Sequence, residues 1–111
     1  MWLIEQRPSR GRWASLWQFV TTEATASPVT AAAVRRAVSV KVGTPRRIGT
    51  VEHALTHRKY RFEVYLCDFR GTPPPQLPAN RRWVRFTDLA AYPLPRPHLR
   101  IAQMLKAVAP I

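Results

Sequence analysis

The chain has 111 residues, 46% of them hydrophobic, which suits one compact domain with a single core. Eighteen Lys and Arg stand against six Asp and Glu, so the formal net charge is +12. This excess is larger than solubility needs and recurs along the chain, which predicts a polyanionic partner. Nucleic acid is the first expectation, and a solvated basic surface or an anionic membrane surface is the alternative.

Cys67 is the only cysteine, so an internal disulfide is excluded, and no His and Cys spacing indicates a zinc or iron–sulfur site. No apolar run reaches the roughly 18 residues of a membrane-spanning helix. The N-terminus lacks the basic-then-apolar order of a secretory signal. We therefore expect a cytoplasmic protein with no metal, no cofactor and no membrane partner.

The strand signals are of two kinds. Short apolar runs predict three strands, at residues 2–4, 16–19 and 82–86. Between residues 46 and 69 apolar and polar side chains instead alternate, which is typical of a half-buried hairpin whose first strand spans about residues 48–54. The apolar face of its second strand carries Tyr60, Phe62, Val64 and Leu66.

Two helices are expected from their start signals and apolar stripes. Ser27 followed by Pro28 is a typical helix start, and Gly43 is a natural stop. The apolar stripe between them predicts a helix of about fifteen residues packed on a sheet. It consists of Val34, Ala37 and Val38. Pro97 opens a closing helix. Its expected inward face consists of Ile101, Ala102, Leu105 and Val108.

The Pro-rich segment at residues 71–78 cannot join a sheet ladder, so we expect an extended surface connection there. Too little chain follows this segment to form a second core. Residues 1–111 are therefore expected to form a single domain. The order strand, strand, helix, hairpin, strand, helix indicates an α/β fold.

Four segments of the chain carry a resemblance to a known family. They are residues 5–8 (EQRP), 16–19 (LWQF), 53–57 (HALTH) and 92–98 (YPLPRPH). Together they resemble the C-terminal, Nudix-like domain of MutY-type adenine DNA glycosylases. The resemblance implies a Nudix-like mixed β-sheet sandwiched between helices. The family's domain begins with one further strand before Trp2, so this chain is expected to be either a shortened module or a piece of a longer protein.

Nudix hydrolases cluster glutamates on one helix, because magnesium bound to a diphosphate needs hard oxygen ligands. The resemblance allows the glycine of that helix motif to be aligned on Gly43. The glutamate positions then fall on Ala37, Val40 and Lys41. Glu23 is the only acid within residues 20–51. We therefore expect no catalytic residue in this chain, with a divergent Nudix nucleotide diphosphohydrolase as the enzymatic alternative.

In the resembled family, a hairpin loop with a Phe-Ser-His-like sequence faces 8-oxoguanine. Position for position, that loop corresponds to Leu55, Thr56 and His57, which are our candidate lesion-recognition residues. Guanine presents an acceptor at N7, whereas the oxidised base presents an N7–H donor, so a fixed hydroxyl acceptor can favour the lesion. Threonine keeps that hydroxyl, while Leu55 lacks the family's aromatic ring. The alternative for Thr56 is a turn hydroxyl bonded to its own backbone.

Basic residues follow this loop and are expected to contact phosphates, which positions a duplex without reading its sequence. They are Arg58, Lys59 and Arg61. His57 is expected to contact phosphate or order the loop, and His53 to be structural. Trp13, Trp17 and Trp83 are expected to pack in the core rather than stack on bases.

The sequence thus predicts a noncatalytic module that binds double-stranded DNA and recognises 8-oxoguanine opposite adenine. In base-excision repair it would act for a glycosylase catalytic domain in cis or in trans, at the bacterial nucleoid. A general nucleic-acid or protein interaction module is the second alternative. Preference for a lesion-containing duplex at equal salt distinguishes it from the main hypothesis, and magnesium-dependent turnover of oxidised dGTP distinguishes the hydrolase.

Overall fold

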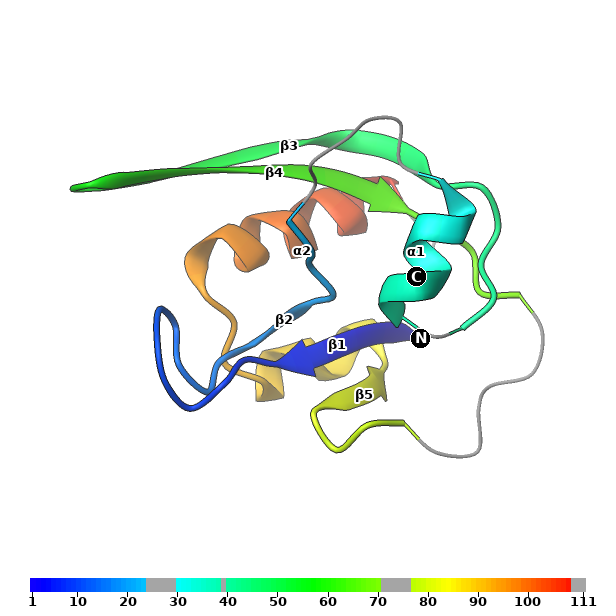
Figure 1. The fold of residues 1–111 in the computed structure, drawn as a ribbon, viewed down its shortest axis with the longest axis horizontal. Coiled ribbons are helices and arrows are strands. Elements are labelled where there is room, and N and C mark those ends of the chain that lie inside the picture. The colour runs from blue at the N-terminus through cyan, green and yellow to red at the C-terminus, as the bar shows by residue number, and fades with distance from the viewer. Residues whose placement is uncertain (24–29, 39, 71–76, 109–111) are drawn as a thin grey trace.

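A computed structural model describes residues 1–23, 30–38, 40–70 and 77–108 (Figure 1). The elements follow the order expected from the sequence, with one short 3-10 helix added. In chain order they are β1 (Trp2–Gln6), β2 (Trp17–Phe19), α1 (Ala31–Val38), β3 (Arg46–Leu55), β4 (Arg58–Leu66), β5 (Arg81–Val84), the 3-10 helix η1 (Phe86–Ala91) and α2 (Arg96–Val108).

The described strands form two sheets, and α2 lies between them (Figure 1). One sheet has the order β2-β1-β5 and the other is the β3–β4 hairpin, and all of these pairings are antiparallel. The expected α/β class is confirmed. In place of one mixed sheet between helices, however, two antiparallel sheets enclose a helix. The two-residue turn between β3 and β4 explains why this pair is antiparallel, because a parallel pairing needs a long crossover.

The core continues from one sheet to the other through α2. Beneath the hairpin, Ile101 and Leu105 pack on Val51 and Val64. On the other side of α2, Ala102 packs against a cluster that centres on Ile4. Aromatic side chains that contact both clusters join them, namely Trp2, Phe19 and Phe86. Each fully buried side chain of this size contributes about 1.5–3 kcal/mol to folding.

Helix α1 covers Ala31–Val38, so the expected length of about fifteen residues was wrong for the described chain. Its N-cap is Thr30, whose hydroxyl accepts a hydrogen bond from the Ala33 N–H (3.1 Å). The expected start at Ser27 and Pro28 lies outside the described residues.

Arg81 closes the other end of α1. Its guanidinium donates a hydrogen bond to the Ala37 carbonyl (2.7 Å). In a longer helix this carbonyl would accept the hydrogen bond from the Lys41 N–H instead. Gly43 is therefore not the residue that stops the helix. It lies beyond it, next to the isolated bridge between Val42 and Phe69.

The closing helix α2 begins at Arg96, one residue before the expected start at Pro97, and it buries Ile101 and Leu105 as predicted. Val108 was wrongly assigned to the inward face, because it is the last residue of the helix and 43% exposed. The apolar stripe therefore ends one turn before the helix does. None of the helices in the described part of the chain has the length and apolar character needed to span a bilayer.

Candidate nucleic-acid interface

The β3–β4 hairpin extends beyond the rest of the molecule and carries a two-residue turn, Thr56–His57, at its tip (Figure 1). Both turn residues are exposed, and the preceding Leu55 is half-buried. The side-chain hydrogen bonds of the described hairpin all lie nearer its root, at Arg47, Thr50, Arg61 and Glu63. The Thr56 hydroxyl takes part in none of them, so it faces solvent with its acceptor positions open.

The residues at the tip are not those that turn geometry favours. Tight two-residue hairpin turns usually place Asn-Gly or a similar pair in the left-handed region of backbone space. Across the described residues, the non-glycine positions with positive φ are instead Trp13 and Ser15. Thr56 and His57 therefore do not owe their place to a left-handed turn conformation. Exposed loop residues often take part in binding, so we consider their side chains as candidate binding groups.

The three basic residues expected to contact phosphate are all exposed, but they lie on two faces of the hairpin. Side chains alternate along a strand, so Arg58 shares a face with Tyr60, whereas Lys59 and Arg61 share the outer face. The tip is therefore flanked by a cation on each side.

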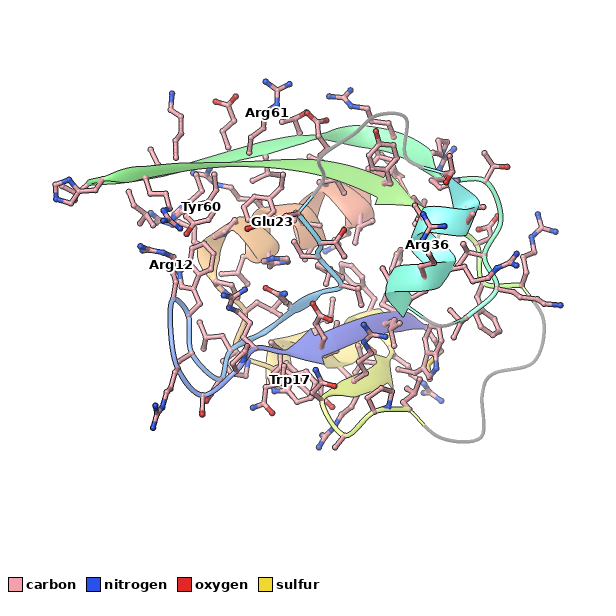
Figure 2. All side chains as sticks on the ribbon, in the orientation of Figure 1. Arg12, Trp17, Glu23, Arg36, Tyr60 and Arg61 are labelled. Atoms are coloured by element: carbon pink, nitrogen blue, oxygen red, sulfur yellow. The ribbon has the colours of Figure 1, made fainter. Side chains whose placement is uncertain are left out.

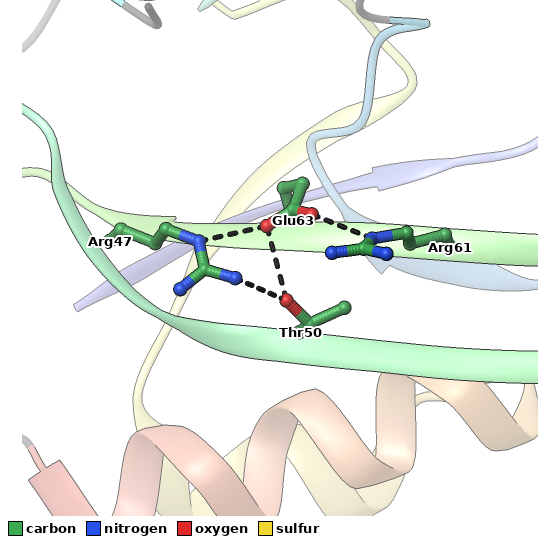
Figure 3. A network of polar contacts seen from close by, with 4 residues as sticks. All are labelled: Arg47, Thr50, Arg61 and Glu63. Atoms are coloured by element: carbon green, nitrogen blue, oxygen red, sulfur yellow. Dashed lines mark hydrogen bonds and ion pairs between the residues drawn. The ribbon is translucent and has the colours of Figure 1, made fainter.

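Arg61 is already paired within the protein (Figure 3). Its Nε lies 2.8 Å from one oxygen of Glu63, and Arg47 Nε lies 2.9 Å from the other. The Thr50 hydroxyl also donates to Glu63 (3.1 Å). Hydrogen bonds from Arg61 and then from Arg47 lower the pKa of Glu63 to about 2. The charge of Arg61 is thus partly balanced at neutral pH, unlike the arrangement expected for a free phosphate contact.

The loop between β1 and β2 contributes residues that sequence reasoning did not place at the site. Trp13 packs against the hairpin, with its ring centroid 5.3 Å from that of Tyr60 and 5.8 Å from that of His53. The Arg12 guanidinium lies over the Tyr60 ring, 5.8 Å from its centroid. Figure 2 shows Arg12 and Tyr60 facing one another between the loop and the hairpin.

Expected core packing holds for Trp17, which is buried beside Tyr92. Trp13 instead joins a surface loop to the β3–β4 hairpin and is half-buried. No feature of the local sequence marks it, because the contact joins segments more than forty residues apart.

Two guanidinium groups alter the acidity of Tyr60. Burial of its ring would raise the pKa of the phenol, but Arg58 and Arg12 together outweigh this effect, so the pKa lies below its ordinary value. A phenol whose ionised form is favoured sits in a positive local field. The field originates from one residue of the hairpin and one residue of the loop.

A polar network holds the β1–β2 loop in place. Arg7 donates from Nε to the Arg12 carbonyl (2.9 Å) and from Nη1 to Gln18 Oε1 (3.1 Å). Gln18 in turn donates to Glu5 Oε2 (2.8 Å), and the Arg7 guanidinium lies 5.7 Å from the centroid of the Trp13 ring. The segments at residues 5–8 and 16–19, on which the resemblance rests, thus order the loop that faces the hairpin.

His98 lies beneath the hairpin and is only 1% exposed. Its Nδ1 accepts a hydrogen bond from the Phe19 N–H (3.2 Å), and its ring packs against those of Phe19 and Phe62. Burial, and then the charge of Arg7, lower the pKa of His98 to about 4. His98 is therefore neutral at pH 7, and its ring packs in the interior.

The three positions at which the resemblance would place glutamates lie on α1 or just after it. Ala37 gives its carbonyl to Arg81, and Val40 is buried after the helix has ended. Lys41 is exposed. Within the described ranges, no three His, Cys, Asp or Glu side chains are grouped so that they could hold a metal ion.

Comparison with known proteins adds a family. The NUDIX domain family matches residues 1–104. No curated protein matches the chain. Because the family match covers nearly the whole sequence and agrees with the α/β architecture, the chain belongs to the NUDIX domain family.

Proposed function

We propose that this chain binds double-stranded DNA through the tip of the β3–β4 hairpin and recognises 8-oxoguanine opposite adenine. The observation that carries the proposal is the Thr56 hydroxyl, exposed at the end of a projecting hairpin and flanked by the cations Arg58 and Lys59. A projecting two-stranded ribbon is narrow enough to enter a DNA groove.

The chemistry of the lesion suits this hydroxyl. Oxidation converts the N7 acceptor of guanine into an N7–H donor and adds a carbonyl at C8. A hydroxyl fixed as an acceptor gains a hydrogen bond with the lesion, whereas with guanine it must turn its own proton toward N7. The Thr56 hydroxyl is available for such a bond because it makes no competing side-chain hydrogen bond among the described residues of the hairpin.

Charge supports a duplex partner. The net charge of +12 attracts a polyanion over long range, and each phosphate neutralised by Lys or Arg releases condensed counterions. The exposed Arg58 and Lys59 place part of this charge beside the tip. Phosphate contacts then fix the position of the duplex, and Thr56 supplies the specificity.

We propose further that the module is noncatalytic and acts for a glycosylase domain in cis or in trans. Support comes from Ala37, Val40 and Lys41, which stand where the resemblance puts metal-binding glutamates. An apolar or cationic side chain cannot provide the hard oxygen ligands that magnesium needs. The division of labour would give this chain the task of finding the damaged base and its partner the task of cutting.

The test compares Thr56→Val with Thr56→Ser in the full chain. Valine keeps the branched shape and removes the acceptor, while serine keeps the hydroxyl. Binding isotherms are measured at one salt concentration for duplexes with 8-oxoguanine or guanine opposite adenine. We expect Thr56→Val to lose about 1–3 kcal/mol on the lesion duplex alone, with Thr56→Ser close to wild type.

Two results would contradict the proposal. An equal loss on both duplexes would make Thr56 a turn residue without a role in discrimination. Equal affinity of the wild-type chain for both duplexes would remove lesion recognition altogether and leave the general interaction module as the function.

A further inference from the structure

We propose that Arg12, Arg58 and the Tyr60 hydroxyl form a clamp for one phosphate of the DNA backbone, between the β1–β2 loop and the β3–β4 hairpin. The clamp rests on the proposed DNA binding and adds a second element of the fold to it. The partner chemistry is a phosphodiester, which offers acceptor oxygens to two guanidinium groups and a phenol.

The geometry brings two like charges together. Arg12 reaches Tyr60 from the loop, 5.8 Å from the ring centroid, and Arg58 lies two positions earlier on the same face of β4, where it helps to lower the pKa of Tyr60. The ion pairs of the described residues lie elsewhere and join Arg47 and Arg61 to Glu63 and Arg81 to Glu5. Two guanidinium groups gathered without a carboxylate repel each other, and an anion between them removes that repulsion. A phosphate fits because guanidinium forks match its oxygens.

The loop is held in this position at a conformational cost. Trp13 and Ser15 have φ values of 55° and 62°, a region that costs non-glycine residues of the order of 1 kcal/mol or more. The tilted packing of Trp13 on Tyr60 and the Arg7 hydrogen bond to the Arg12 carbonyl offset that cost. Such strain is found at functional sites where it fixes a geometry in advance. Here it fixes Arg12 over the hairpin.

The clamp and the recognition tip lie at the same end of the molecule. Tyr60 is four residues beyond Thr56 along the hairpin, and a strand rises about 3.4 Å per residue. The clamp is therefore on the order of 10 Å from the tip, a distance of a few nucleotides along a duplex that rises roughly 3.4 Å per nucleotide of each strand. One phosphate can be held while a nearby base is read.

The test uses the full chain and two charge-matched variants, Arg12→Gln and Arg36→Gln. Arg36 lies on α1, well away from Arg12 in Figure 2, so its loss lowers the net charge equally without touching the clamp. Affinity for lesion and undamaged duplexes is measured over a range of salt concentrations. We expect Arg12→Gln to weaken binding about tenfold on both duplexes and to reduce the log–log salt slope by about 0.9, the value for one phosphate contact. Arg36→Gln should leave the slope unchanged.

A third variant, Tyr60→Phe, removes the hydroxyl and keeps the ring that Trp13 packs on. We expect a smaller loss of affinity than with Arg12→Gln and no change in the salt slope, because a neutral donor is removed. Equal affinities and slopes for Arg12→Gln and Arg36→Gln would overturn the clamp while DNA binding stands. Absence of duplex binding by the wild-type chain would overturn both the clamp and the proposed function.

Discussion

The root of the β3–β4 hairpin, where the strands pack on α2, and its tip, Thr56–His57, differ in what accounts for their residues. At the root, Val51 and Val64 are buried against α2, so apolar burial accounts for the residues found there. At the tip, Thr56 and His57 are exposed and do not match the usual preference of a tight turn. One part of the hairpin thus stabilises the fold, whereas the residues of the other part make no evident contribution to folding and are available to a binding partner.

The largest expected effect concerns the root, through His98. The folded pKa of about 4 lies below the ordinary value of 6.5, so the unfolded chain binds the proton more readily. The free energy of unfolding should therefore fall as the pH drops from about 6.5 to about 4, by an amount on the order of 3 kcal/mol. Above about pH 6.5 the titration of His98 should add no pH dependence to the stability, because the group is neutral in both states.

Urea denaturation at several pH values measures this dependence, and His98→Asn provides the control. Asparagine offers an acceptor in place of Nδ1 but cannot titrate, so the variant should be less stable at pH 7 and less sensitive to acid in the same window. An unchanged acid dependence in His98→Asn would show that other groups destabilise the root.

The smallest expected effect is a difference in duplex binding between variants of Lys59 and Arg61, two neighbours on the outer face of β4. Lys59→Gln should weaken duplex binding and reduce the salt slope by about 0.9, because it removes a cation beside the tip. Arg61→Gln should weaken duplex binding less than Lys59→Gln does, since the Arg61 guanidinium is already paired with Glu63. Salt-dependent binding isotherms of the two variants compare them directly. A larger loss for Arg61→Gln would move the interface from the tip toward the root.

Much of the fold follows from local patterns in the sequence. Alternation in β4 predicted which side chains face α2, and Pro97 marked the start of the closing helix, because both signals act within a few residues. The length of α1 could not be predicted, because the Arg81 side chain that closes it comes from a distant strand. The division into two sheets is likewise set by packing on both sides of α2.

The candidate site was predictable only in part. The hairpin and its exposed tip follow from the HALTH segment between two extended runs. Arg12 and Trp13 belong to the site because they contact Tyr60, which is distant in the sequence. Arg61 forms an ion pair with Glu63, two residues further along the same strand. Sequence patterns identify which residues are cationic, whereas the structure decides which cations are paired within the protein.

The most direct test of the difference between root and tip is a titration of the isotopically labelled full chain with the 8-oxoguanine duplex, followed by NMR. The account predicts that the amide signals of Thr56 and His57 and the indole N–H signal of Trp13 shift on binding. The signals of Val51, Val64 and α1 should stay in place, because burial at the root and distance from the tip keep them from the duplex. Shifts centred on α1, with the tip and Trp13 unchanged, would contradict the account.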